Sequence, residues 1–138
     1  MSELVRVSIS LEQSLLDKLE SLVEQSGYGN RSEFIRDLIR ARLVEEAWEA
    51  DEEAIGTVSL VYDHHARQLG EKLTDLQHDH HEQVLATTHV HLSHDLCAEV
   101  IILKGRASQI RSLADSIRRQ KGVLHAQLSM GSTGQDLT

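Results

Sequence analysis

The sequence contains no proline and is poor in aromatic residues and cysteine. Its 138 residues include one Trp, one Phe and two Tyr, so any hydrophobic core has to be mainly aliphatic. The single cysteine, Cys97, excludes an internal disulfide and leaves either a buried bystander or a working thiolate. The sequence also lacks an apolar run of about 20 residues and a basic-then-apolar leader, which predicts a cytoplasmic protein that does not bind membranes.

The charge balance limits the kinds of partner that the chain can have. A net charge of −8 argues against a surface that coats nucleic acid as a whole, but it permits a small, local DNA-reading surface. The length suits one ordinary domain or two small ones. Two small domains would each be marginally stable alone, so we expect the chain to form oligomers.

The N-terminal segment alternates strictly between apolar and polar residues over positions 5–11, which predicts a β-strand. The polar face consists of Arg6, Ser8 and Ser10. A single strand needs a partner, yet the spacing of leucines and isoleucines predicts that two helices follow, separated by a turn at 27–29. The segment 30–33, Asn-Arg-Ser-Glu, is typical of a helix N-terminus with a reciprocal capping glutamate.

This order of strand, helix, turn and helix resembles the ribbon–helix–helix family of DNA-binding proteins. The resemblance implies that two chains pair their strands into a ribbon that enters the major groove. Arg6 could then bind guanine, while Ser8 and Ser10 could bind bases on either strand. Asn30 and Arg31, at the start of the second helix, could hold a phosphate. The alternative is that the polar face is only the solvent-exposed side of an edge strand.

The rest of the chain predicts a second, α+β domain. We expect strands at 56–62, 83–93, 96–103 and 122–129, with helices at 65–78 and 108–120. The order βαββαβ is the ferredoxin-like arrangement, with both helices on one sheet face. The predicted organisation is a ribbon–helix–helix DNA-binding domain at 1–48, an acidic linker at 49–54, a ferredoxin-like domain at 55–130 and a disordered tail at 131–138.

Histidine is the most unusual feature of the composition, with nine residues, most of them between positions 64 and 94. His89 and His91 lie two residues apart, which places both side chains on one face of a strand. A turn at 93–95 would bring Cys97 back across from them. Two imidazoles and a thiolate suit nickel, copper or zinc, and His78, His80 or His81 could supply a fourth donor. Histidines at this spacing can also be ordinary surface residues.

Taken together, the chain resembles the nickel-responsive ribbon–helix–helix repressors, the NikR family, over roughly residues 4–130. The resemblance rests on the segments 6–11 (Arg-Val-Ser-Ile-Ser-Leu) and 27–33 (Gly-Tyr-Gly-Asn-Arg-Ser-Glu), and above all on His89-Val90-His91 with Cys97. It implies a square-planar Ni(II) site of His89, His91, Cys97 and, from another subunit, His78. It also implies a homotetramer, a dimer of dimers around a ferredoxin-like (ACT-type) core, that binds operator DNA and represses nickel uptake rather than catalysing a reaction.

The resemblance extends to supporting residues. Tyr62 and Glu99 match residues that support the metal ligands. Glu33 and Asp37 match carboxylates that bind a further cation when DNA is bound, although capping alone also explains Glu33.

Two departures from the family pattern change what is expected. Asp79 interrupts a histidine run that continues in close relatives, which puts additional metal binding there in doubt. Ser8 and Ser10 stand where threonine is common, so operator preference can differ. The remaining histidines are expected at the surface or near the ligands: His64, His65, His94 and His125.

Two other functions remain open. The C-terminal domain of a ribbon–helix–helix regulator could sense a different metal or a small molecule. A metallohydrolase is the third possibility, but only Glu99 is a candidate general base beside the histidines, and the N-terminal module would have no role.

Overall fold

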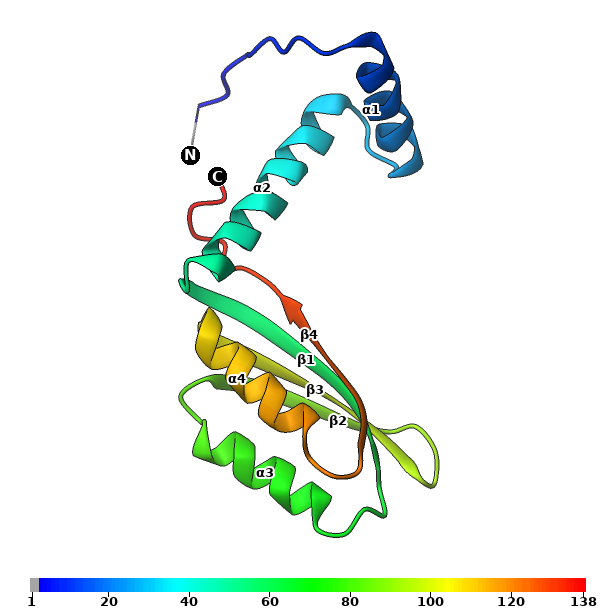
Figure 1. Cartoon of the computed structure of the whole chain (residues 1–138), viewed down its shortest axis with the longest axis vertical. Helices are drawn as coiled ribbons and strands as arrows, with labels where there is room; N and C mark the ends of the chain where they lie inside the picture. Colours follow the sequence, from blue (N-terminus) through cyan, green and yellow to red (C-terminus); the bar gives the residue numbers. More distant parts are fainter. Residues whose placement is uncertain (1–2) are drawn as a thin grey trace. The chain divides into compact units, whose positions relative to one another are not determined.

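The computed structural model describes residues 3–138 and divides into two compact units (Figure 1). One unit comprises residues 3–43 together with 135–138, and the other comprises residues 44–134.

Two helices form the first unit, α1 (Gln13–Gln25) and α2 (Arg31–Glu49), of which α2 continues into the second unit. The chain leaves α1 through Gly27, whose φ of 73° is the left-handed conformation that glycine adopts without strain. The side chain of Asn30 caps α2, because its Oδ1 accepts a hydrogen bond of 3.0 Å from the backbone N–H of Glu33. The predicted N-cap is therefore confirmed.

Residues 3–12 form no strand in the single chain. The side chains of the predicted apolar face, including Val5 and Val7, are largely exposed. A strand has to pair with another strand, and the described part of one chain offers none to this segment. The pairing of two such segments into a ribbon stays a prediction.

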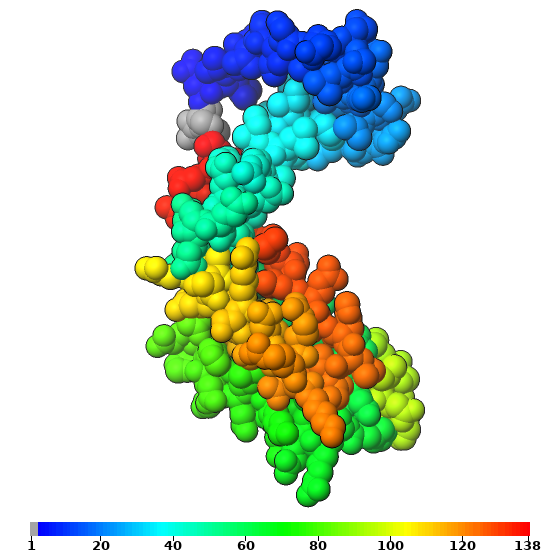
Figure 2. All heavy atoms as spheres, in the orientation of Figure 1, coloured from blue at the N-terminus to red at the C-terminus, as the bar shows by residue number. Residues whose placement is uncertain are grey.

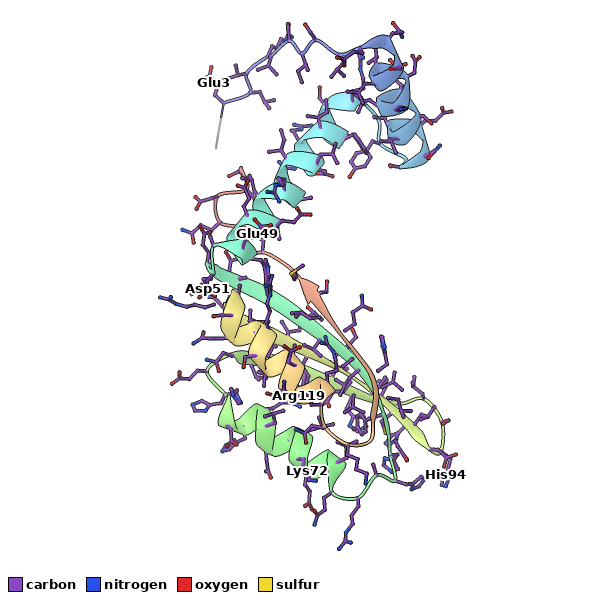
Figure 3. The ribbon with its side chains drawn as sticks, viewed as in Figure 1. Glu3, Glu49, Asp51, Lys72, His94 and Arg119 are labelled. Atoms are coloured by element: carbon purple, nitrogen blue, oxygen red, sulfur yellow. The ribbon has the colours of Figure 1, made fainter. Side chains whose placement is uncertain are left out.

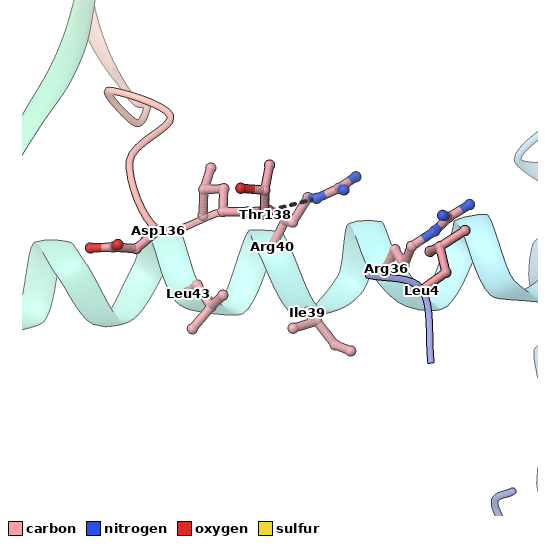
Figure 4. A pocket seen from close by; sticks show the side chains of 8 residues that line it. Leu4, Arg36, Ile39, Arg40, Leu43, Asp136 and Thr138 are labelled. Atoms are coloured by element: carbon pink, nitrogen blue, oxygen red, sulfur yellow. Dashed lines mark hydrogen bonds between the residues drawn. The ribbon is translucent and has the colours of Figure 1, made fainter. Parts of the chain in front are cut away.

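Apolar side chains of α2 also remain uncovered in the first unit. Ile39 and Leu43 line a pocket of about 430 Å³ on α2, where the Nε of Arg40 donates a hydrogen bond of 3.0 Å to the carbonyl oxygen of Leu137 (Figure 4). The full lining is Leu4, Arg36, Ile39, Arg40, Leu43, Asp136, Leu137 and Thr138. An apolar helix face of this kind is stable only when further chain covers it.

The second unit is one antiparallel sheet with two helices on one of its faces (Figure 1). Its elements in chain order are β1 (Glu53–Asp63), α3 (Leu69–Asp79), β2 (Val84–His91), β3 (Leu96–Arg106), α4 (Ala107–Arg118) and β4 (Val123–Met130). The spatial order of the strands is β2-β3-β1-β4, so β2 and β4 are the sheet edges. This confirms the predicted ferredoxin-like α+β fold.

Alternation along the central strands builds the core of this unit. Val58 and Leu60 of β1 face the helices, as do Ile101 and Leu103 of β3, and all four are buried. The helices contribute Leu69, Leu73, Ile110, Leu113, Ala114 and Ile117. Figure 2 shows α4 and β4, yellow to orange-red, side by side on the surface of this unit. The core is almost wholly aliphatic, as the composition predicted.

Trp48, at the end of the predicted DNA-binding domain, packs in the second unit. The indole is 3% exposed and belongs to the core of the second unit, where its Nε1 donates a hydrogen bond of 2.9 Å to the carbonyl oxygen of Gly131. The backbone N–H of Gly131 in turn donates to the carbonyl oxygen of Ile55 at 2.7 Å. Burial of one large aromatic side chain therefore holds the last turns of α2 and the start of the predicted tail against this unit.

Trp48→Ala is expected to lower the free energy of unfolding of the second unit by about 3–5 kcal/mol, because it leaves a large cavity and an unpaired carbonyl at Gly131. Urea unfolding followed by circular dichroism measures the change. The exposed Arg119→Ala is the matched control and should change stability by less than about 0.5 kcal/mol. Equal stability of both variants would contradict the assignment of Trp48 to the core.

Candidate metal centre

The hairpin of β2 and β3 places His91 and Cys97 opposite each other. In the antiparallel register His91 lies across from Cys97, and His89 lies across from Glu99. The turn is closed by a backbone hydrogen bond of 2.9 Å from the N–H of Leu92 to the carbonyl oxygen of Leu96. The hairpin thus returns the thiol to a position opposite one of the two imidazoles, that of His91.

The cysteine thiol lies beneath a group of imidazoles. Its Sγ is 3.3 Å from the Nδ1 of His91 and 3.3 Å from the Nδ1 of His64, and Cys97 itself is 0% exposed. The ring centroids of His89 and His91 are 5.1 Å apart. Donor atoms of His64, His91 and Cys97 all lie within 4.8 Å of one another, which makes these three a candidate metal-binding group.

His64, expected only at the surface or near the ligands, lies next to Cys97. It follows β1, and Tyr62 two residues earlier pairs with Cys97 across the sheet. The backbone N–H of His64 donates a hydrogen bond of 2.8 Å to the carbonyl oxygen of Asp95, which fastens its loop to the β2–β3 turn. His64 lies two residues after Tyr62, a spacing that places both side chains on the same face of an extended chain. This spacing points to Cys97 only when the pairing of β1 with β3 is known.

His78 lies elsewhere in the single chain. It is exposed in the last turn of α3, with its ring centroid 6.3 Å from that of His81. Within residues 3–138 it does not belong to the donor group around Cys97.

The phenol of Tyr62 lies beside His89. Its oxygen is 3.4 Å from the Nδ1 of His89, and the rings meet edge to face. Burial raises the pKa of Tyr62 to about 12, and the nearby charge of Glu99 adds to the shift, so the phenol is protonated at neutral pH. A metal bound to Nδ1 of His89 would replace this contact. A metal bound to Nε2 would keep it, with Nδ1–H donating to the phenol oxygen.

Glu99 is a buried carboxylate on the same sheet face, 7% exposed. It accepts hydrogen bonds from the Oγ1 of Thr87 at 2.9 Å and from the Nε2 of Gln77 at 3.3 Å. Since Gln77 precedes His78 on α3, one carboxylate ties this helix to both strands of the hairpin. Tyr62 contacts His89 directly, whereas the hydrogen bonds of Glu99 go to residues next to the candidate ligands.

The two carboxylates predicted to bind a further cation already have protein partners. The phenol of Tyr28 donates a hydrogen bond of 2.5 Å to the Oδ2 of Asp37, and Arg40 lies 3.2 Å from its Oδ1. The hydrogen bond from Tyr28, followed by that from Arg40, holds the pKa of Asp37 below its usual range. Glu33 lies 4.0 Å from Arg36. A cation here would have to compete with these side chains.

The predicted DNA-binding residues all lie in the first unit and are exposed. Arg6, Ser8 and Ser10 belong to the unpaired segment before α1, and Asn30 is occupied as the cap of α2. Arg31 lies 3.6 Å from Glu20 of α1, an exposed ion pair that phosphate could displace at little cost.

None of the helices within residues 3–138 combines the length and the apolarity needed to cross a bilayer.

The fold and the site together define a class of protein. It has an N-terminal unit of two helices and an α+β domain in which imidazoles surround a thiol. Comparison with known families agrees. Residues 55–131 match the model of the NikR C-terminal nickel-binding domain, and residues 5–46 match the ribbon–helix–helix proteins of the CopG family. The chain belongs to the family of nickel-responsive regulators, which are transcriptional regulators and not enzymes.

The relatives are similar over their whole length. A protein of Geobacter sulfurreducens is 49% identical over 138 residues, and one of Solibacter usitatus is 51% identical, each alignment covering 99% of both chains. A third, from Nitratidesulfovibrio vulgaris, is 48% identical over 100% of both chains. All three are named as nickel-responsive regulators. An uncharacterized protein of Thermotoga maritima shares only the fold, at a TM-score of 0.52 and 15% identity over 57% of this chain and 98% of its own.

The raised pKa of Tyr62 predicts that its phenol stays protonated in the folded protein up to about pH 12, whereas the unfolded chain ionises near pH 10. Stability from this group is thus complete below pH 10 and is lost between pH 10 and 12. Absorbance at 295 nm of the metal-free Tyr28→Phe variant, folded and in urea, measures both midpoints. Coincident midpoints near pH 10 would show that Tyr62 is not buried.

Proposed function

We propose that the chain is a nickel-dependent repressor that binds operator DNA when Ni(II) occupies a site of His89, His91 and Cys97, completed by His78 of a second subunit. The observation that carries the proposal is the contact between the Sγ of Cys97 and the Nδ1 of His91, at 3.3 Å across a closed hairpin. Nickel uptake is the process that such a repressor would control.

The donor chemistry fits a late first-row divalent metal. A thiolate and several imidazoles are the ligands that nickel and copper prefer over the oxygen ligands of calcium or magnesium. When bound, the ion would supply a crosslink between β2, β3 and the fourth donor. Tyr62, which contacts His89, and Glu99, which binds Thr87, would hold β2 in place beside the ion.

The identity of the fourth donor has one specific alternative. His64 lies 3.3 Å from Cys97 in the same chain, so His64, His89, His91 and Cys97 could bind an ion without a second subunit. With that donor set the C-terminal domain could sense a different metal. The proposal keeps His78, because its place beside Gln77 on α3 would let the ion order that helix.

Operator binding is assigned to the paired N-terminal segments. Arg6, Ser8 and Ser10 would face base edges in the major groove, while Asn30 and Arg31 would hold the phosphate backbone. In support, the apolar residues that alternate with them, Val5, Val7 and Ile9, are exposed in one chain. Pairing with a second chain would bury them.

Assembly into a homotetramer, a dimer of dimers, is part of the same proposal. The sheet face opposite the helices carries exposed Val90, Val100 and Ile102, and Leu92 follows on the turn. An apolar face of this extent favours burial against another chain. We place the protein in the cytoplasm, where reducing conditions keep Cys97, a free cysteine, available to a metal.

A titration of the metal-free protein with Ni(II) tests the site. The expected result is thiolate-to-metal charge-transfer absorption that saturates at one ion per chain and disappears in Cys97→Ser, with metal affinity reduced by more than about 100-fold. His125→Ala, an exposed histidine on β4, is the control and should titrate as the original protein does. Binding without a charge-transfer band would exclude Cys97 as a ligand.

Two further variants decide between the donor sets. His78→Ala should remain folded but lose nickel-dependent DNA binding in a gel-shift assay, while His64→Ala should retain it. The reverse pattern would assign the fourth position to His64 and to a single chain.

Arg6→Ala is expected to weaken binding to the operator by about 1–3 kcal/mol, because a bidentate contact to guanine is lost, while binding to unrelated DNA changes little. Fluorescence anisotropy with both DNAs at a fixed salt concentration measures the difference. Lys121→Ala, an exposed cation outside the first unit, is the control. An equal loss on both DNAs would place Arg6 on the phosphate backbone instead.

A further inference from the structure

Three side chains next to the Cys97 cluster form a second group of donors. A ring nitrogen of His65, one of His94 and a carboxylate oxygen of Asp95 lie within 4.8 Å of one another, and all three residues are exposed. The Nε2 of His65 is 3.1 Å from the Oδ1 of Asp95, and the ring centroids of His65 and His94 are 5.2 Å apart. The proposed nickel site does not use any of these side chains.

We infer that His65, His94 and Asp95 bind a second divalent metal ion at the surface of this domain. Two imidazoles and one carboxylate are a common ligand set for zinc and for other first-row ions of intermediate softness, with water in the remaining positions. Donors around an ion at about 2.1 Å lie about 3.4 Å apart, so the present spacing needs only a small closure.

The backbone already holds these donors in place. The N–H of His65 donates a hydrogen bond of 2.8 Å to the Oδ1 of Asp63, which fixes the start of its loop. In the β2–β3 turn, the N–H of Asp95 donates to the Oγ of Ser93 at 3.3 Å. The bond from the N–H of His64 to the carbonyl oxygen of Asp95 then joins the two segments. A site of this kind loses little conformational entropy when the ion binds.

The second site differs from the Cys97 site in chemistry and in access. It has no sulfur ligand, and its side chains are exposed, with His94 at the tip of the hairpin (Figure 3). The rings of His64 and His65 are 5.4 Å apart, so the two sites adjoin through neighbouring residues. An ion held by His65 and Asp95 would therefore also order the loop that carries His64.

Equilibrium dialysis of the full chain against Zn(II), with Co(II) absorption as a second readout, tests this site. His65→Ala combined with His94→Ala should bind one ion per chain fewer than the original protein. Its thiolate-to-cobalt charge-transfer band, which reports the Cys97 site, should be unchanged. The control His125→Ala should lose no equivalent.

Asp95→Asn provides a milder second variant, because it keeps an oxygen but removes the charge. It should weaken the same equivalent by about tenfold or more while leaving the fold intact by circular dichroism. An unchanged number of bound ions in the double variant, or unchanged affinity in Asp95→Asn, would overturn the second site. Absence of the charge-transfer band in the original protein would instead contradict the proposed nickel site. Failure of the second site and failure of the nickel site therefore give different results.

Discussion

The pairing register of β2 and β3 is the constraint on which the candidate metal centre depends. Side chains alternate along a strand, so a shift of one residue would move His89 and His91 to the opposite face of the sheet, away from Cys97. The tight turn at 92–95 and the buried residues of β3 hold this register. Packing in the core, in which Cys97 takes part, thus fixes which of these side chains lie together.

The two units of the chain differ in how much of their apolar surface they bury within one chain. Residues 44–134 bury an aliphatic core under two helices and include Trp48 from the end of α2. The first unit, by contrast, leaves the alternating apolar residues before α1 and the stripe on α2 exposed. Exposed apolar side chains of this kind would gain stability if a second copy of the chain covered them.

Local patterns were sufficient to predict most of the fold and two of the three side chains in the candidate group around Cys97. The alternation of β1, the helical spacing in α4 and the cap at Asn30 are all short-range signals, and the structure follows them. His91 and Cys97 were predictable for the same reason, since one turn joins their strands. His64 was not, because it reaches Cys97 through the pairing of β1 with β3, which distant parts of the chain decide. The burial of Trp48 was likewise invisible, because its partner Gly131 lies at the other end of the domain.

Glu99 gives the strands a direct connection to α3. Its carboxylate lies across from His89 in the register and accepts one hydrogen bond from Thr87 on β2 and one from Gln77 on α3. Loss of either donor would leave a buried polar oxygen with one hydrogen bond fewer, which is costly. Through these two bonds Glu99 links β2, at Thr87, to α3, at the residue before His78. The same short network therefore joins the strand that carries His89 and His91 to the helix that carries His78.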